Sequence, residues 1–247
     1  MWSPDTDVLI LLLDCWWCVR KKWKFEGWRV QWKKMYLLQE CTSLHCCHGN
    51  LGTQTCLKIL TSKSSKYREI DVVKRVEIIG PNKCKRLTGL HNFTGADWGG
   101  KFVGISKKTW VAAYMKLDEN VPAISCFQEL GQGCIAADFI NGELPAQVKA
   151  LEGFVCPVYC GTGPITLPAL RWELFRSKNL EGEMLPATRG AVLPHTMRAN
   201  YIAMRDKSYS VNCPNLPPIE QNGWNLEDGC YVPVRCLTLP APKLYLR

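Results

Sequence analysis

Two carboxylates near the start of the chain have a spacing that suggests metal chemistry. Asp5 and Asp7 lie one residue apart, just before the branched aliphatic run of residues 8–13. A short continuous apolar run is typical of a strand covered on both faces, and on a strand both carboxylates would share one side. Two carboxylates held that close repel unless a cation lies between them. The same residues also fit a turn, because Pro4 fixes φ and aspartate side chains bond nearby backbone amides.

A cluster of cysteines and histidines is a second candidate for metal chemistry. Structural zinc needs four such ligands, usually as two close pairs. The C-x2-C and C-x3-H pairs of this cluster are separated by residues 19–40, so unpaired thiols are favoured over zinc. The cluster consists of Cys15, Cys18, Cys41, His45, Cys46, Cys47, His48 and Cys56. A later group does not make a convincing zinc set: Cys156, Cys160, Cys213, Cys230 and Cys236.

Length and composition bound the class of protein. With 247 residues, 47% of them apolar, the chain can bury one large core or two modest ones. Residues 8–13 are too few to span a membrane, and the acids at Asp5 and Asp7 do not fit the positive start of a secretory signal. The 14 cysteines are therefore expected to be reduced. We expect an intracellular protein, with the nucleus as one candidate compartment and an oligomeric state that the sequence does not indicate.

Much of the formal charge of +9 lies in one segment, residues 15–50. There Trp23, Trp28 and Trp32 alternate with lysine and arginine, which suits stacking on bases and neutralising phosphates. The segment matches neither its neighbours nor a standard element, so an insertion without a role in the core is favoured. Residues 20–34 of this segment hold Arg20, Lys21, Lys22, Lys24, Arg29, Lys33 and Lys34, against the single acid Glu26.

The elements that would position a site become regular from residue 51. Residues 54–60 predict a strand or short hairpin and residues 66–80 a strand or helix, closed by Gly80 and Pro81. Residues 89–117 then predict a helix stopped by Gly95, with Asp97 on the following turn. A glycine turn at residues 103–109 opens a second helix, whose first-turn amides and nearby lysines suit binding of one phosphate.

Two of these motifs resemble parts of the flap-endonuclease-like (PIN-like) nucleases. "SPDTDVLILLL" is similar to their strand with an acid-x-acid pair, and "FTGADWGGKFVGISKKTW" to their acidic turn and helix-two-turn-helix hairpin. The chain resembles most closely the uncharacterised, transposon-associated animal proteins that carry such a domain, including their tail, similar to "LPATRGAVLPHTMRANY" here. The resemblance covers residues 3–13 and about 51–242, and skips the tryptophan-rich segment.

The resemblance implies a site for hydrolysis of phosphodiesters. Asp5, Asp7 and Asp97 would be the catalytic, metal-binding carboxylates, with Mg2+ or Mn2+ activating water and neutralising the leaving oxygen. Contacts to the DNA or RNA backbone would come from Lys101, Gly104, Ser106, Lys107 and Lys108. Ala96 and Ser106 depart from the family pattern, which has cysteine and glycine there. The family's first strand and further acids are missing, so we expect a chain truncated at both ends with an incomplete site.

The remaining sequence predicts helices and one small hairpin. Residues 122–133, 143–160, 167–178 and 196–206 read as helices, and residues 222–234 as a hairpin with Trp224 packed under it. The apolar spacing assigns Leu170, Leu174 and Phe175 in one helix, and Met197, Tyr201 and Met204 in another, to the core rather than to a site. His195, after Pro194, is expected near a helix start without a catalytic role, and His91 as a helix histidine.

These observations predict an α/β fold with an incomplete, mostly parallel sheet, a helix-two-turn-helix-like subdomain and a mainly helical C-terminal part. The expected divisions are residues 1–14, 15–50, 51–120 and 121–247. Three functions stay open. The first is a metal-dependent nuclease-like domain, expected to be an incomplete remnant with weak or no activity. The others are a non-catalytic nucleic-acid-binding module and a zinc-stabilised interaction protein.

Overall fold

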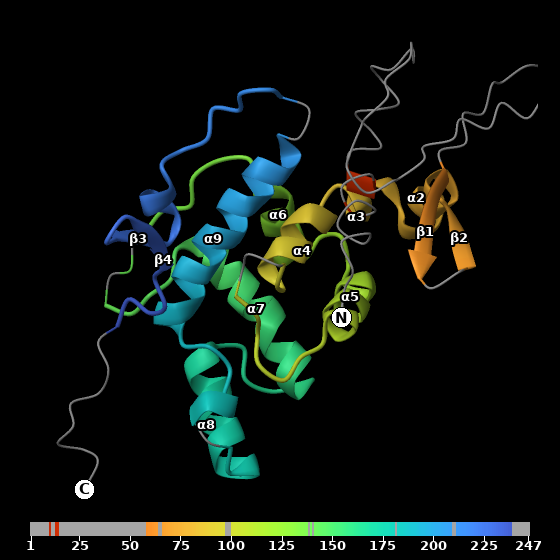
Figure 1. Cartoon of the computed structure of the whole chain (residues 1–247). Coiled ribbons are helices and arrows are strands. Elements are labelled where there is room, and N and C mark those ends of the chain that lie inside the picture. The colour runs from red at the N-terminus through yellow and green to blue at the C-terminus, as the bar shows by residue number, and fades with distance from the viewer. Residues whose placement is uncertain are drawn as a thin grey trace, which may run out of the picture. The chain divides into compact units, whose positions relative to one another are not determined.

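The structure is a computed structural model of a mixed α/β protein. It describes residues 10, 13–14, 58–63, 66–96, 100–137, 139, 141–180, 182–208 and 211–238. The chain divides into two compact units, Met1–Lys85 and Arg86–Arg247 (Figure 1). The boundary lies inside the segment 51–120 that the sequence suggested as one division.

From residue 58 on, the described part of the first unit consists of a hairpin followed by two helices. Strands β1 (Lys58–Lys63) and β2 (Lys66–Asp71) pair antiparallel, and α2 (Val72–Ile79) follows directly. Gly80, at a φ of 89°, separates α2 from α3 (Pro81–Cys84). Helix α3 begins at Pro81, and the N–H that proline lacks costs nothing there, because the N–H groups of the first turn have no acceptor within the helix. The break at residues 80–81 lies where it was predicted. The hairpin is formed by residues 58–63 and 66–71 rather than within residues 54–60, and residues 66–80, predicted as one strand or helix, form a strand followed by a helix.

The strand predicted for residues 8–13 is wrong where the structure describes it. Ile10, Leu13 and Asp14 are helical and buried. A short apolar run does not distinguish a buried strand from a buried helix, and leucine is a good helix former. The mostly parallel sheet is likewise not found among the described residues, whose strands form only the antiparallel pairs β1–β2 and β3–β4.

The second unit is mainly helical, with one small hairpin. Its helices, drawn in Figure 1, are α4 (Leu87–Phe93), α5 (Lys107–Lys116), α6 (Pro122–Glu129), α7 (Ala146–Cys160), α8 (Leu167–Lys178) and α9 (Arg189–Lys207). Two short 3-10 turns, η1 (Gly182–Met184) and η2 (Ile219–Asn222), precede α9 and the hairpin of β3 (Trp224–Glu227) and β4 (Cys230–Pro233). The predicted helices and hairpin of this region are confirmed. None of the described helices is long and apolar enough to cross a membrane.

A cluster of aromatic rings forms the core of this unit. Phe127 of α6 packs edge-on against Phe154 of α7, with ring centroids 5.1 Å apart, and against Phe93 of α4 at 5.8 Å. Trp110 of α5 packs against Phe154 at 5.5 Å. These side chains are buried, and Tyr114, one turn after Trp110, is buried against Phe127. Edge and tilted ring contacts of this kind add to the stabilisation from apolar burial.

Helix α9 begins before the proline that the sequence suggested as its start. Pro194 lies inside the helix and has no N–H to donate to the carbonyl of Gly190. The N–H of Leu237 donates to that carbonyl instead, at 2.9 Å. A tertiary contact therefore replaces the lost helical bond, which is why a helix through this proline is not visible in the local sequence.

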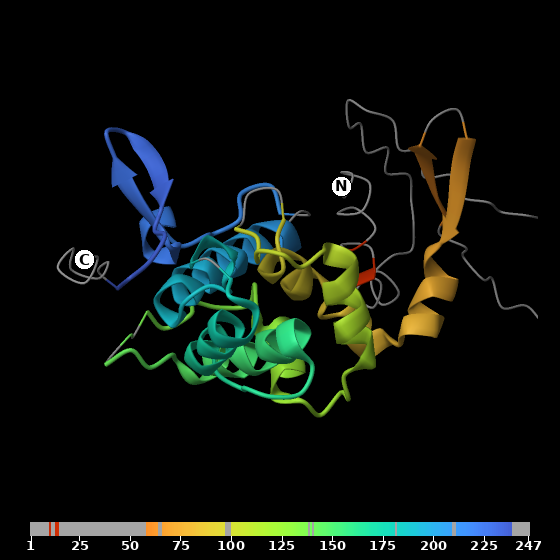
Figure 2. The ribbon, with the colours of Figure 1, turned by 90° about the horizontal axis from the view of Figure 1, so that it is seen from below.

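The C-terminal hairpin is specified by its turn. Glu227 pairs with Cys230, and the two turn residues Asp228 and Gly229 have φ values of 48° and 76°. Two positive φ values in a two-residue turn match the twist of a hairpin, and Asp-Gly is a favoured sequence for them. Trp224 packs against Tyr201 of α9, with ring centroids 5.6 Å apart. Figure 2 shows the hairpin standing out from the helices of this unit.

Candidate nucleic-acid interface

The first turn of α5 is the part of the predicted site that the structure describes. Gly104, at a φ of 74°, makes the turn before the helix, and Ser106 is the N-cap. The Ser106 hydroxyl accepts from the N–H of Thr109 at 3.2 Å, which explains why serine suits this position where the family pattern has glycine. Lys101, Gly104, Ser106 and Lys108 are exposed.

The connection between α4 and α5 is fixed by the carbonyls that end α4. The last four carbonyls of a helix have no partner within it, and here each one accepts from another donor. Leu90 O accepts from the N–H and hydroxyl of Thr94, and Asn92 O from the N–H of Gly95. His91 O accepts from the Lys107 ammonium, and Phe93 O from the His195 ring at 2.7 Å.

Lys107 therefore has a role inside the protein. Its ammonium also donates to the carbonyl of Gly95 at 2.8 Å, so it holds the end of α4 against the start of α5. Lys108, next along the helix, points to solvent. Of the three lysines predicted to contact the nucleic-acid backbone, Lys101 and Lys108 are exposed as that role requires, whereas Lys107 is bonded within the protein.

His195 is a buried residue of this region whose contacts the sequence did not predict. Its ring packs edge-on against Phe93 and Phe102, and its Nε2 donates to Phe93 O. The pKa of this imidazole is lowered to about 4, mainly by burial and also by the nearby charges of Arg198 and Lys107, while the hydrogen bond to Phe93 O opposes the shift. The ring is thus neutral at pH 7. Gly100 packs closely against it, since a Cβ added at Gly100 would lie 2.9 Å from the Nδ1 of His195.

Neither a family model, nor a curated protein, nor a solved structure matches this chain.

The predicted carboxylates lie outside the described residues. This applies to Asp5, Asp7 and Asp97, to the cysteine and histidine cluster of residues 15–56, and to the tryptophan-rich segment. In the part of the chain that the structure describes, no group of three or more histidine, cysteine, aspartate or glutamate side chains could hold a metal ion. The metal-site predictions therefore stay predictions.

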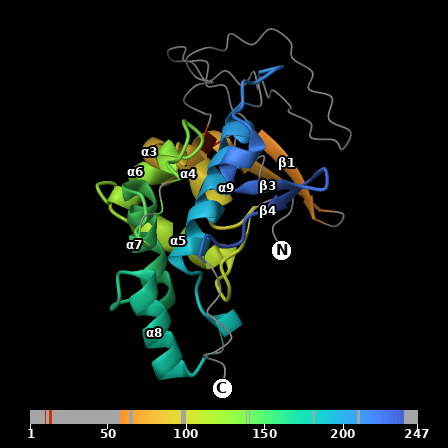
Figure 3. The same cartoon turned by 90° about the vertical axis from the view of Figure 1, so that its left-hand side faces the viewer.

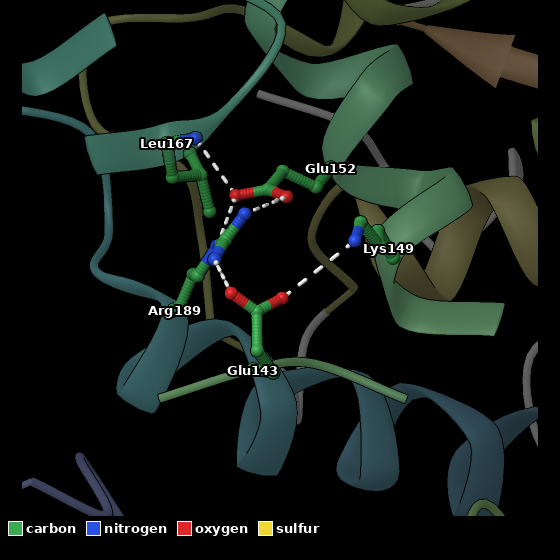
Figure 4. A network of polar contacts seen from close by, with 5 residues as sticks. All are labelled: Glu143, Lys149, Glu152, Leu167 and Arg189. Atoms are coloured by element: carbon green, nitrogen blue, oxygen red, sulfur yellow. Dashed lines mark hydrogen bonds and ion pairs between the residues drawn. The ribbon is translucent and has the colours of Figure 1, made fainter. Parts of the chain in front are cut away.

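A buried ionic network joins three helices of the same unit. Glu152 of α7 has 1% of its side chain exposed, and its two oxygens accept from Nε and Nη2 of Arg189 at 2.8 and 3.0 Å (Figure 4). The same carboxylate accepts from the N–H of Leu167, the first residue of α8, at 2.8 Å. Arg189 also contacts the exposed Glu143. Every partner in this network is a protein group, which indicates a structural role.

A pocket of about 230 Å³ between α6, α7 and α9 offers little for binding. Asn200 projects into it, but its amide group donates to Gly133 O at 2.7 Å and its oxygen accepts from the N–H of Gly131. Gln147 at the rim donates to Glu129. These polar groups are already bonded within the protein.

An exposed aromatic pair on α8 was not predicted from the sequence. Leu170 and Leu174 are buried as predicted, but the core position assigned to Phe175 is wrong, because its side chain is 50% exposed. Phe175 lies beside Trp172, which is 64% exposed. Helical spacing showed that α8 is apolar on more than one side, but which side is covered depends on tertiary partners.

Proposed function

We propose that the chain is a nucleic-acid-binding module that contacts the phosphate backbone through the start of α5 and the loop before it. The supporting observation is the exposure of Lys101 and Lys108 around a helix N-terminus, in a stretch, residues 98–117, with four lysines and no acid. First-turn amides and the positive end of the helix dipole attract phosphate. Contacts of this kind are independent of base sequence.

The binding can be tested through its salt dependence. We expect the variant Lys101→Gln/Lys108→Gln to bind a labelled duplex of about 20 base pairs more weakly than the native chain, and its log–log salt slope to fall by about 2, since each phosphate contact contributes about 0.9. Fluorescence anisotropy at several salt concentrations measures both quantities. Lys116→Gln, an exposed lysine in the last turn of the same helix, is the matched control. Unchanged affinity and slope in the double variant would refute the proposal.

A second candidate is metal-dependent hydrolysis of the bound phosphodiester. It is favoured by α4, the turn at Gly95 and α5, which occur at the residues where the resemblance predicts a helical hairpin around an acidic turn. Asp5, Asp7 and Asp97 would hold Mg2+ or Mn2+, and three carboxylates suit such hard cations. The metal would activate a water and stabilise the leaving oxygen.

Cleavage of a branched DNA in the presence of Mn2+ tests this second candidate. We expect cleavage to depend on the metal and to be lost in Asp97→Ala, while binding of the same DNA is retained without metal. Asp118→Asn, which changes an exposed carboxylate beyond the end of α5, is the control. Binding without any cleavage would leave the module as the function and reject hydrolysis.

A further inference from the structure

The outward side of α8 carries two neighbouring aromatic rings. Trp172 and Phe175 are three residues apart on the helix, their ring centroids are 6.2 Å apart, and their planes are inclined by 32°. The opposite side of α8 is buried through Leu167, Leu170 and Leu174. In Figures 1 and 3, α8 extends away from the other helices of its unit. The rings are thus held by a packed helix and open to solvent.

Such a pair has no role in the core. Aromatic side chains contribute most to stability when they are covered, yet Trp172 is 64% and Phe175 50% exposed. Exposed apolar groups that lie together mark a binding surface more often than scattered single residues do. Ile165, in the segment that leads into α8, is also largely exposed.

The charges of α8 favour an anionic partner. Its last turn carries Arg176 and Lys178, and its first turn has no acid. The acid beside the rings, Glu173, already pairs with Arg176 at 3.0 Å. Helix α8 carries three basic residues, Arg171, Arg176 and Lys178, against Glu173, so two copies of α8 facing each other would bring together two helices of net positive charge. The charge therefore argues against a second copy and for a polyanion that also offers flat apolar faces.

We propose that Trp172 and Phe175 form a stacking platform for the bases of a single-stranded nucleic acid, with Lys178 at its phosphates. Every base has a flat face that can stack on an aromatic side chain, so this binding needs no particular sequence. Bases of a duplex are already stacked on each other, so the platform selects single strands. The inference shares its ligand class with the proposed function but uses a separate site.

The test compares ring variants on a single strand. With a labelled oligothymidylate of about 12 nucleotides, we expect Trp172→Ala and Phe175→Ala each to raise Kd about 5- to 150-fold, the range for loss of one stacked base. Trp172→Phe should retain most of the affinity. Tyr231→Ala removes an aromatic of similar exposure (48%) from β4 and should change Kd by less than about twofold. Circular dichroism confirms that each variant is folded.

Two further arms separate this site from the start of α5. Binding of a duplex should be unaffected by the ring variants, and Lys101→Gln/Lys108→Gln should leave the effect of Trp172→Ala on the single strand intact. If the lysine variant changes nothing while the ring variants weaken single-strand binding, the proposed function fails and this inference stands. A native chain that does not bind the single strand, ring variants without effect, or a native dimer that Trp172→Ala dissociates would each overturn the inference.

Discussion

The buried imidazole of His195 makes the stability of the second unit depend on pH. Its pKa in the folded chain is about 4, because burial disfavours the charged ring, whereas an unfolded histidine titrates near 6.5. Between these values the unfolded chain binds a proton that the folded chain does not. The contribution of the neutral His195 ring to the free energy of unfolding is therefore fully present above pH 6.5, and it is lost as the pH falls toward 4.

The size of the loss follows from the two pKa values. The interval from 6.5 to about 4 corresponds to about 3 kcal/mol in the limit of low pH, at about 1.4 kcal/mol for each pH unit. Between pH 7.5 and pH 4.5, we expect His195 to remove about 2 to 3 kcal/mol from the free energy of unfolding. Urea unfolding followed by circular dichroism at both pH values measures the total loss.

A variant separates this contribution from other groups that titrate in the same range. Gln at position 195 cannot take up a proton but keeps an amide that can donate to Phe93 O, so His195→Gln should lose about 2 to 3 kcal/mol less than the native chain over the same pH interval. His91→Gln, which changes another buried histidine of the same unit, is the control for the effect of the substitution itself on stability at pH 7.5. If His195→Gln loses as much stability as the native chain, the assignment to His195 is wrong.

Two packing predictions can be checked by unfolding at neutral pH. Glu152→Gln removes the buried charged partner of Arg189 and leaves only the exposed Glu143, so we expect a loss of about 3 kcal/mol, at the low end for a broken buried pair. The exposed Glu143→Gln should cost at most about 1 kcal/mol. In Gly89→Ala the new Cβ would lie 2.0 Å from a backbone oxygen of α6, so we expect a loss above about 1 kcal/mol although alanine favours helix. The control is Gly153→Ala, where a Cβ meets no atom within 4 Å, and neutral or higher stability is expected there. A stable Gly89→Ala variant, or equal losses in the two glutamate variants, would contradict these contacts.

The elements that the sequence predicted correctly are those with local causes. The turn at Asp228 and Gly229 and the glycine turn that opens α5 each depend on residues a few positions apart. The start of α9 was missed because the bond that allows Pro194 inside the helix comes from Leu237, far along the chain. Ile10 and Leu13 were misread as strand because period and length do not separate a buried strand from a buried helix in so short an apolar run.

The candidate site was predictable to the same degree. The α4 stop, the glycine turn and the exposed start of α5 follow from local sequence, and all lie where they were expected. That Lys107 turns inward could not be predicted, because it requires the position of the α4 carbonyls, which depends on how α4 packs. The exposure of Phe175 was missed for the same reason: a helix sequence shows its apolar sides but not which of them a neighbour covers.

The buried polar residues of α9 hold the irregular segments of the second unit in place. His195 binds the last carbonyl of α4, Arg198 donates to the carbonyls of Gly223 and Val234, and Asn200 binds the turn after α6. Each bond satisfies a backbone group that helices and strands leave without a partner. These polar groups of α9 are therefore used in fixing the fold. Because His195 and Lys107 both bind carbonyls at the end of α4, we expect a change at His195 to reach the start of α5, where phosphate binding is proposed.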